Sequence, residues 1–336
     1  MVTLFVDRKG LTLRADSSAL AFYDGNERMG TVPLKLLERV CIRGDLQLSA
    51  SVLGKLGEHG AGVVVLSGRK RQPVLLMPNL KVDAQRRMAQ FNLAQNADFC
   101  LRQAKGWVGG KVASQAALLE RFSTKSDVLR ARLHQPCSVL AGVAGEIGAA
   151  ADTARLRGLE GAAAARYFAA LAYVLPDSLN FNGRNRRPPA DAFNAVLSLG
   201  YTLLHFELVR QVYLTGLDPF VGFYHGIEHG RESLACDLVE PIRPLYDEWA
   251  VSLFADGVLR AEDFSMRGGA CEMGKAGRMR FYAAFETAAK SWRPQMRRLC
   301  MDLLSALGGA LGDESGCFAE SEMVAAEEND ALADCL

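Results

Sequence analysis

The stretch 74-VLLMPNLKVDAQRRMAQFNLAQ-95 contains the change of pattern that decides the fold class. Before it, apolar residues stand in short runs that turn sequences separate, which is typical of β-strands. From about residue 83 onward, they recur with a period near 3.6, the period of an amphipathic helix. Pro78 ends the last strand-like run. The sequence therefore predicts two domains that meet between residues 79 and 90.

Residues 1–82 are expected to form a small β domain. Turn sequences such as Asp24-Gly25-Asn26 and Gly68-Arg69-Lys70 separate its strands, and residues 49–58 have the apolar spacing of one helix that Gly60 closes. The expected strands are 3–6, 11–13, 19–23, 40–42, 63–66 and 74–77.

Residues 83–312 are expected to form a larger, all-helical domain, because strand-like alternation is absent from them. Two irregular stretches interrupt the pattern: 180–189, with two adjacent prolines, and 216–226, a loop with spaced glycines. The fold class is therefore α+β, with a small strand-rich N-terminal domain and a larger helical domain. The expected helices are 83–104, 111–122, 138–154, 158–175, 190–214, 232–255, 274–290 and 292–311.

The chain is long and apolar enough to be a globular protein. Its 336 residues suffice for about two domains, and 49% of them are hydrophobic, which excludes disordered and collagen-like chains. No apolar run approaches the roughly 18 residues that cross a bilayer, and charged residues at 7–9 do not fit a secretory signal. We therefore expect a soluble, cytoplasmic protein with no membrane partner.

Charge is distributed unevenly along the chain. Residues 313–336 hold eight acids and no Lys or Arg, whereas the rest carries a net charge of +9, and 29 of the 39 basic residues are arginines. Arginine suits phosphate oxygens, which favours a nucleic-acid partner. An arginine-rich surface that reflects a high-GC genome is the alternative. The acidic tail is expected to be a solvated, disordered appendage.

Glu160 is the first of three candidate site residues. It is expected in the first turn of the helix 158–175, where a carboxylate interacts well with free amides, so capping is its ordinary role. A spacing of seven places Tyr167 on the same face of that helix.

His225 and Asp237 are the other two candidates. His225 ends the segment 222–225, where an imidazole between aromatic residues and a glycine is either buried and hydrogen-bonded or a ligand. Asp237 stands among apolar neighbours and is costly to bury without a positive group. A divalent cation or a salt bridge to Arg231 or Arg243 would each compensate it.

Seven segments between residues 157 and 243 combine these residues with others in a fixed order. They are RGLEG (157–161), RYF (166–168), GRNRRPP (183–189), NAVLSLGY (194–201), GLDP (216–219), GFYH (222–225) and GRESLACDLVE (230–240). Their order and wording closely resemble the CRISPR-associated integrase family Cas1, the spacer-acquisition enzymes of bacterial and archaeal adaptive immunity. The strand-then-helix layout resembles the family over nearly the whole chain.

The resemblance implies a ligand set for one divalent ion, Mg²⁺ or Mn²⁺. Glu160 matches the Glu of the family's R-G-x-E-G helix, His225 the His of G-F-x-H, and Asp237 the Asp of S-L-A-x-D-L. Tyr167 matches the aromatic position near the metal, which implies a catalytic role in orienting DNA. The chain departs from the family in 111-KVASQ-115, where Ser114 replaces the usual Asn of K-x-x-N-Q.

The resemblance also implies the reaction. The 3′-hydroxyl of a DNA fragment attacks a phosphodiester of the CRISPR repeat, and water in its place would make the protein a metal-dependent endonuclease. Two carboxylates and an imidazole suit Mg²⁺ or Mn²⁺. Six arginines are expected to contact DNA phosphates, with solvated surface charge as the alternative. They are Arg157, Arg166, Arg184, Arg186, Arg187 and Arg231.

The partners that the resemblance implies are double-stranded and branched DNA, a second copy of the chain joined through the β domain, and a dimer of Cas2. Two other functions stay open at this point. One is a DNA-binding structural subunit of the adaptation complex that lacks catalysis, against which the intact triad counts. The other is a related transposon-type integrase. Such enzymes usually append a basic domain, whereas residues 313–336 are acidic.

Overall fold

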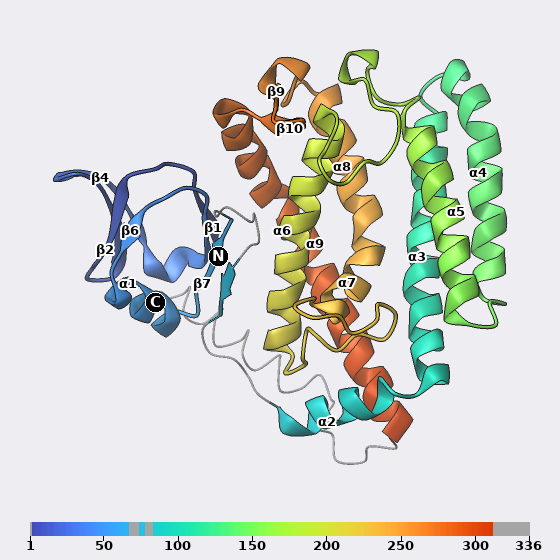
Figure 1. Ribbon diagram of the computed structural model, residues 1–336, viewed down its shortest axis with the longest axis horizontal. Coiled ribbons are helices and arrows are strands. Elements are labelled where there is room, and N and C mark those ends of the chain that lie inside the picture. The colour runs from blue at the N-terminus through green and yellow to red at the C-terminus, as the bar shows by residue number, and fades with distance from the viewer. Residues whose placement is uncertain (1, 67–73, 78–82, 312–336) are drawn as a thin grey trace. The chain divides into compact units, whose positions relative to one another are not determined.

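The computed structural model describes residues 2–66, 74–77 and 83–311 (Figure 1). The expected turn at 68–70 and the acidic segment 313–336 lie outside the described residues. The chain divides into two compact units. The strand-rich unit takes in residues 258–266 and 272–290 as well as the N-terminal 80 residues, and the rest belongs to the helical unit. The α+β fold class expected from the sequence is confirmed.

Among its described residues, the strand-rich unit consists mostly of two four-stranded sheets and one helix. The strand orders are β1-β5-β7-β8 and β4-β3-β2-β6, with β1 parallel to β5 and β5 parallel to β7. The elements are β1 (Val2–Val6), β2 (Leu11–Asp16), β3 (Ala19–Asp24), β4 (Glu27–Pro33), η1 (Leu34–Leu36), β5 (Leu37–Ile42), β6 (Gln47–Leu48), α1 (Ala50–Glu58), β7 (Gly62–Val65) and β8 (Val74–Leu76).

Side-chain alternation explains the core of this unit. In β2, Leu11 and Leu13 are buried while Arg14 is exposed, so one face of the strand packs inward. All six residues of β5 are buried because the strand lies between β1 and β7. The sequence did not indicate β4, whose residues are mostly exposed, although the turn at Gly25 that leads into it is confirmed.

The first part of a long C-terminal helix, α9 (Lys275–Leu311), also belongs to the strand-rich unit. The Tyr282 ring stacks on Phe5 of β1 with 4.2 Å between centroids. Arg278 pairs with Asp7 at 2.5 Å. The backbone N–H of Thr3 donates to Glu286 at 3.1 Å, so the helix satisfies a donor on the edge strand of the sheet.

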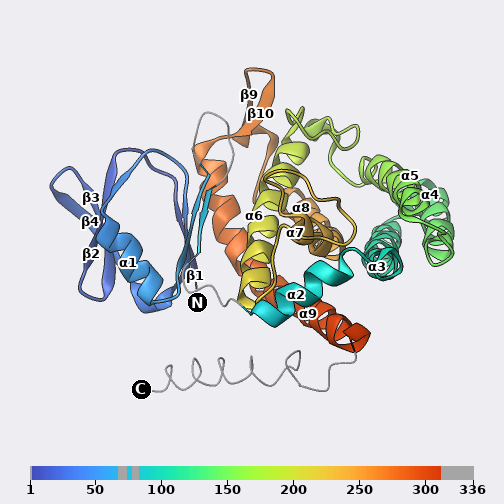
Figure 2. The same cartoon turned by 60° about the horizontal axis from the view of Figure 1, so that its bottom comes forward.

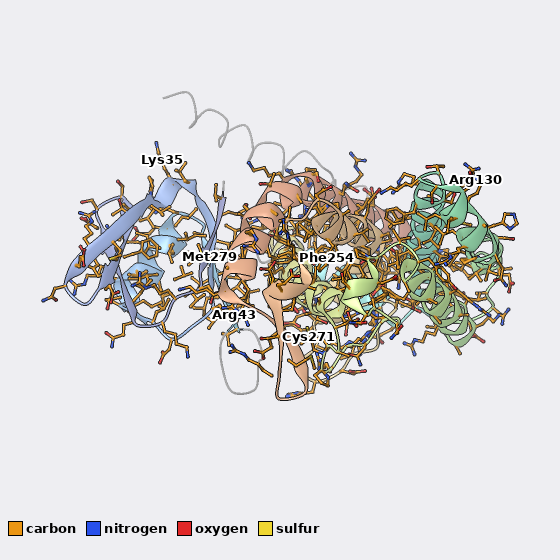
Figure 3. All side chains as sticks on the ribbon, turned by 90° about the horizontal axis from the view of Figure 1, so that it is seen from above. Lys35, Arg43, Arg130, Phe254, Cys271 and Met279 are labelled. Atoms are coloured by element: carbon orange, nitrogen blue, oxygen red, sulfur yellow. The ribbon has the colours of Figure 1, made fainter. Side chains whose placement is uncertain are left out.

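The helical unit contains the predicted site residues. Helices α3, α4 and α5 lie side by side, and α6, α7 and α8 lie on the other side of α3 (Figures 1 and 2). Phe254 lies inside the unit beside Phe193, whereas Arg130 projects from the outer side of α4 (Figure 3). The elements are α2 (Ala84–Leu93), α3 (Ala97–Ser123), α4 (Asp127–Ile147), α5 (Thr153–Leu171), η2 (Asp177–Leu179), α6 (Ala192–Leu214), α7 (Ser233–Val239), η3 (Glu240–Ile242), α8 (Arg243–Ala255) and η4 (Ala261–Asp263).

Polar caps set where five of these helices begin. In each, the side chain before the helix accepts a hydrogen bond from the backbone N–H three residues later, which satisfies a donor that the helix leaves free. The capping residues of α2 to α6 are Asp83, Asn96, Ser126, Asp152 and Asp191. The cap at Asn96 divides the expected helix 83–104 into α2 and α3, so that prediction was wrong.

Other helix boundaries also differ from those expected. The expected helix 111–122 is the second half of α3, which runs unbroken through Gly109 and Gly110. Likewise, α4 continues through Pro136 and α9 through Pro294, because buried side chains on both sides hold each helix against its neighbours. A small hairpin of β9 (Phe264–Arg267) and β10 (Ala270–Met273) corrects the expectation that every element after residue 82 is a helix.

Within the described residues, α6 is a helix long and apolar enough to cross a membrane by length and composition. However, 72% of its most apolar window is buried inside the protein. Its apolar residues therefore face neighbouring elements, as they do in a core helix.

The close packing of Gly200 against Tyr246 generates a stability prediction. A Cβ on Gly200 would lie 1.9 Å from the Tyr246 ring, and the Tyr246 hydroxyl is fixed by a 2.7 Å hydrogen bond to the carbonyl of Val196. We expect Gly200→Ala to lower the free energy of unfolding by about 1–3 kcal/mol or more in urea titrations. Gly142→Ala is the control, since its Cβ meets nothing within 4 Å, and it should leave stability unchanged or raise it. Equal stability of the two variants would contradict the prediction.

Candidate metal and active site

The carboxylate of Asp237, on α7, is completely buried and is held by the loop before that helix. Its Oδ2 accepts the backbone N–H groups of Phe223 and Tyr224 at 2.7 and 3.0 Å, and its Oδ1 accepts that of His225 at 2.8 Å. Three donors from one loop compensate the loss of hydration of this charge. The loop conformation and the buried acid therefore depend on each other.

His225 contacts the same acid through its side chain. Nδ1 lies 2.7 Å from Asp237 Oδ1, and the imidazole is one-quarter exposed. A carboxylate on one ring nitrogen orients the other nitrogen, Nε2, for a ligand, as in many metal-binding histidines. The salt-bridge alternative for Asp237 was wrong: Arg231 pairs with Glu228, and Arg243 pairs with Glu240.

Gly222 allows this loop to approach α7. A Cβ at position 222 would lie 2.7 Å from Asp237 Oδ2 and 2.9 Å from the backbone carbon of Ser233. Both distances are shorter than real contacts. The absence of a side chain at Gly222 is therefore required for the donors at 223–225 to reach the acid.

Glu160 lies in the middle of α5, not in its first turn as expected. The helix begins earlier because Asp152 caps it and because Gly158 and Gly161 continue the helix without a break. The Glu160 carboxylate therefore has no free amides of the helix end to interact with. Its partners come from other elements: Lys111 on α3 and Tyr224 in the loop.

Lys111 lies between two carboxylates. Its Nζ is 2.6 Å from Glu160 Oε1 and 2.5 Å from Glu240 Oε2, and its side chain is 9% exposed. Burial raises the pKa of Glu240, but Arg243 and Lys111 outweigh it and lower that pKa to about 2. Glu240 is therefore ionised at neutral pH, and Lys111 forms ion pairs with both carboxylates.

Tyr224 joins Glu160 to the loop that holds Asp237. Its hydroxyl donates to Glu160 Oε2 at 2.5 Å, and its carbonyl accepts from Arg157 at 2.9 Å. Burial, and then the hydrogen bond to Glu160, raise the pKa of the Tyr224 phenol. Because Tyr224 precedes His225, one loop contacts Glu160 and Asp237 together.

The donor atoms of the predicted triad suit a hard divalent cation, since they are carboxylate oxygens and one imidazole nitrogen. His225 and Asp237 are in direct contact, and Glu160 is connected to the adjacent Tyr224. As they stand, no three His, Cys, Asp or Glu side chains in residues 2–66, 74–77 and 83–311 are grouped tightly enough to hold a metal ion. Joint ligation by the triad stays a prediction.

Tyr167 donates a hydrogen bond to an acid outside the predicted triad. It is completely buried, and its hydroxyl donates to Asp247 Oδ2 at 3.1 Å, while the Tyr201 hydroxyl donates to Oδ1 at 2.5 Å. Burial raises the pKa of Asp247 to about 6, although the two tyrosines oppose the shift. The aromatic hydroxyl that contacts Glu160 belongs to Tyr224 instead. The DNA-orienting role of Tyr167 stays a prediction.

The six arginines expected at DNA differ in exposure and in contacts. Arg157, Arg166, Arg186 and Arg187 are exposed, whereas Arg184 and Arg231 are half-buried. Three of the six contact other groups of the protein: Arg157 the Tyr224 carbonyl, Arg231 the Glu228 carboxylate, and Arg184 the Asn194 side chain. An exposed guanidinium that is hydrated is better suited to contact a phosphate than one bonded to the protein. It does not have to break a hydrogen bond or ion pair within the protein when DNA binds.

A family model described as "CRISPR associated protein Cas1" matches residues 4–287. The chain belongs to the Cas1 family. One relative, "CRISPR-associated endonuclease Cas1 1" of Thermodesulfovibrio yellowstonii, is 37% identical over 89% of this chain and 93% of its own length. Another, "CRISPR-associated endonuclease Cas1 2" of Rhodospirillum rubrum, is 34% identical over 87% of each chain. Membership makes this chain an enzyme of CRISPR adaptation.

Solved structures share the fold at lower identity. A Cas1 protein from Thermotoga maritima matches with a TM-score of 0.78 at 19% identity, covering 94% of this chain and 98% of that one. A casposase bound to integration product matches with the same TM-score at 20% identity, covering 95% and 94%. The fold therefore does not separate a CRISPR enzyme from a transposon-type integrase. The curated Cas1 relatives support the CRISPR assignment.

The Cas1 motifs indicated the candidate ligands but not the side chains that hold them. Lys111, Tyr224, Glu240 and Asp247 had no assigned role. For Lys111 a signal was present: it stands in the apolar stripe of α3 together with Ala104, Val108 and Val112. A charged residue on the core face of a helix needs a buried partner.

Asp247 generates a prediction about pH and stability in this Cas1-family enzyme. Its pKa of about 6 in the folded protein exceeds its ordinary value of 3.8, so the stability it contributes is complete below pH 3.8 and is lost as pH rises through 6. We expect the free energy of unfolding of the wild type, relative to Asp247→Asn, to fall by about 2 kcal/mol between pH 4 and pH 7. Urea titrations of both proteins across this range measure it. A difference that does not change with pH would contradict the prediction.

Proposed function

We propose that this Cas1-family chain inserts DNA into a CRISPR array by transesterification at a site formed by Glu160, His225 and Asp237. The observation that carries the proposal is the buried Asp237, which accepts hydrogen bonds from three loop amides and contacts the His225 imidazole, while the residue before His225, Tyr224, contacts Glu160 through its hydroxyl. A buried acid, an oriented imidazole and a second acid in one connected group are typical of a catalytic cation site.

In this proposal the three side chains hold Mg²⁺ or Mn²⁺. The cation would act as a Lewis acid on the phosphate and lower the pKa of the attacking hydroxyl. Asp237 fixes the orientation of the His225 ring, and Glu160 supplies the second carboxylate. The 3′-oxygen of the incoming strand forms a bond to the repeat phosphorus, and the bond from that phosphorus to its own 3′-oxygen breaks. No side chain becomes covalently attached, and water as the nucleophile would give hydrolysis instead.

Exposed arginines would bind the DNA backbone without reading sequence. Arg157 and Arg166, on α5 with Glu160, and the pair Arg186 and Arg187 have the exposure that this role needs. We propose a second role for Arg157, Arg184 and Arg231 besides contact with DNA phosphates. Each of them also holds in place the loop that it contacts. In this proposal Tyr167 helps to orient the DNA, and its hydrogen bond to Asp247 fixes the position of its own ring.

The assembly is proposed from the named relatives. A "Cas6-RT-Cas1--Cas2 complex" chain matches with a TM-score of 0.77 at 22% identity, covering 92% of this chain and 35% of that one. The casposase structure is bound to an integration product. We therefore propose that this chain acts in the cytoplasm as a homodimer, joined through its strand-rich unit, with Cas2 and double-stranded or branched DNA.

Removing any proposed ligand should abolish strand transfer. We expect Glu160→Ala, His225→Ala and Asp237→Ala each to reduce integration of a labelled fragment into a repeat-bearing plasmid by at least about 100-fold in Mn²⁺ or Mg²⁺, with DNA binding retained. Glu146→Ala is a matched control, since Glu146 is an exposed carboxylate paired only with a surface arginine among its described contacts. Full activity in all three ligand variants would refute the proposal.

Replacing the exposed arginines should change the salt dependence of DNA binding. We expect the double variant Arg186→Gln, Arg187→Gln to weaken binding equally on unrelated sequences, and to reduce the slope of log K against log salt by about 2. Fluorescence anisotropy between about 50 and 200 mM salt measures the slope. Arg130→Gln, on the outer face of α4, is the control. An unchanged slope in the double variant would remove these residues from the DNA contact.

A further inference from the structure

Both oxygens of the Glu160 carboxylate are engaged by side chains that no part of the mechanism above uses. Lys111 Nζ lies 2.6 Å from Oε1, and the Tyr224 hydroxyl lies 2.5 Å from Oε2. The two partners come from elements far apart in the chain: Lys111 from α3 and Tyr224 from the loop beside α7. A flexible side chain in the middle of α5 is thus held from two sides.

The charge arrangement makes Lys111 matter more to Glu160 than to Glu240. Glu240 also pairs with Arg243 at 3.0 Å, so a second cation compensates it. Glu160 has Lys111 for its ion pair and Tyr224 for its other oxygen. Because Lys111 is itself buried, water cannot replace these carboxylates as partners of its ammonium group.

We propose that Lys111 and Tyr224 are positioning residues that fix the Glu160 carboxylate in the orientation in which it ligates the catalytic cation. The inference rests on the proposed function of Glu160. Hydrogen bonds to a ligating carboxylate set its geometry and raise metal affinity, and their loss typically costs 10–100-fold. Tyr224 has a second effect, since it precedes His225 and its backbone N–H binds Asp237. Tyr224 therefore fixes the distance between the Glu160 carboxylate and the loop that carries the His225 imidazole.

The test is Mn²⁺ affinity of the DNA-free, full-length protein, measured by electron paramagnetic resonance. We expect Tyr224→Phe, which removes one oxygen atom, to weaken Mn²⁺ binding about 10-fold or more without changing the melting temperature beyond that of the control. Tyr246→Phe is the matched control, because it also removes a buried tyrosine hydroxyl that donates a hydrogen bond, to the Val196 carbonyl. It should bind Mn²⁺ as the wild type does.

Lys111→Met should weaken Mn²⁺ binding by a similar or larger factor. If the loss of a buried cation prevents folding, Tyr224→Phe decides the question alone. A double-mutant cycle separates positioning from general structure. Adding Tyr224→Phe to Glu160→Gln should have no further effect on Mn²⁺ affinity, because the hydroxyl acts through the carboxylate.

The two ideas fail in different ways. If Glu160→Gln binds Mn²⁺ as tightly as the wild type, the proposed function of Glu160 is wrong. If Glu160→Gln loses Mn²⁺ while Tyr224→Phe keeps wild-type or tighter affinity, the ligand assignment stands and the positioning role is overturned. An additive effect of the two substitutions would also overturn it, since Tyr224 would then act independently of Glu160.

Discussion

The burial of one carboxylate constrains the whole candidate site. The Asp237 carboxylate can be buried inside the helical unit only if donors surround it, and the loop at 223–225 supplies three of them. To do so the loop must come close to α7, which requires a glycine at 222. The same loop conformation then places His225 on the acid and Tyr224 on Glu160. The positions of two predicted ligands thus follow from the solvation of the third.

A connected set of charges extends this constraint across the helical unit. Lys111 on α3 joins Glu160 on α5 to Glu240 on η3, and Arg243 on α8 pairs with Glu240 and lies over the Tyr201 ring. Each element contributes a group that is costly to bury alone. Packing these helices together and satisfying their charges are therefore the same requirement, and a helix that shifted would leave a buried ion unpaired.

The sequence predicted those features that depend on local pattern. Strands such as β2 follow from alternation, and the α+β fold class, with strands followed by helices, follows from the change of period near residue 83. The sequence did not predict β4, because an exposed strand has no apolar alternation. Glu160 was expected at a helix start because Asp152 was not recognised as the N-cap of α5. The ligand candidates came from family motifs. Their partners could not be predicted, because Lys111 meets Glu240 across 129 residues of chain, and no local spacing encodes that contact.

The contribution of α9 to the strand-rich unit has a consequence for dissecting the protein. A fragment ending near residue 82 would contain all strands of both sheets yet lack Tyr282, Arg278 and Glu286. Phe5 would lose its stacking partner, and Asp7 and the Thr3 amide would be left to solvent along an open sheet edge. Such an isolated piece would be prone to self-association through β1. An autonomous version would need the segment 258–290 supplied in the same polypeptide, joined by a new linker.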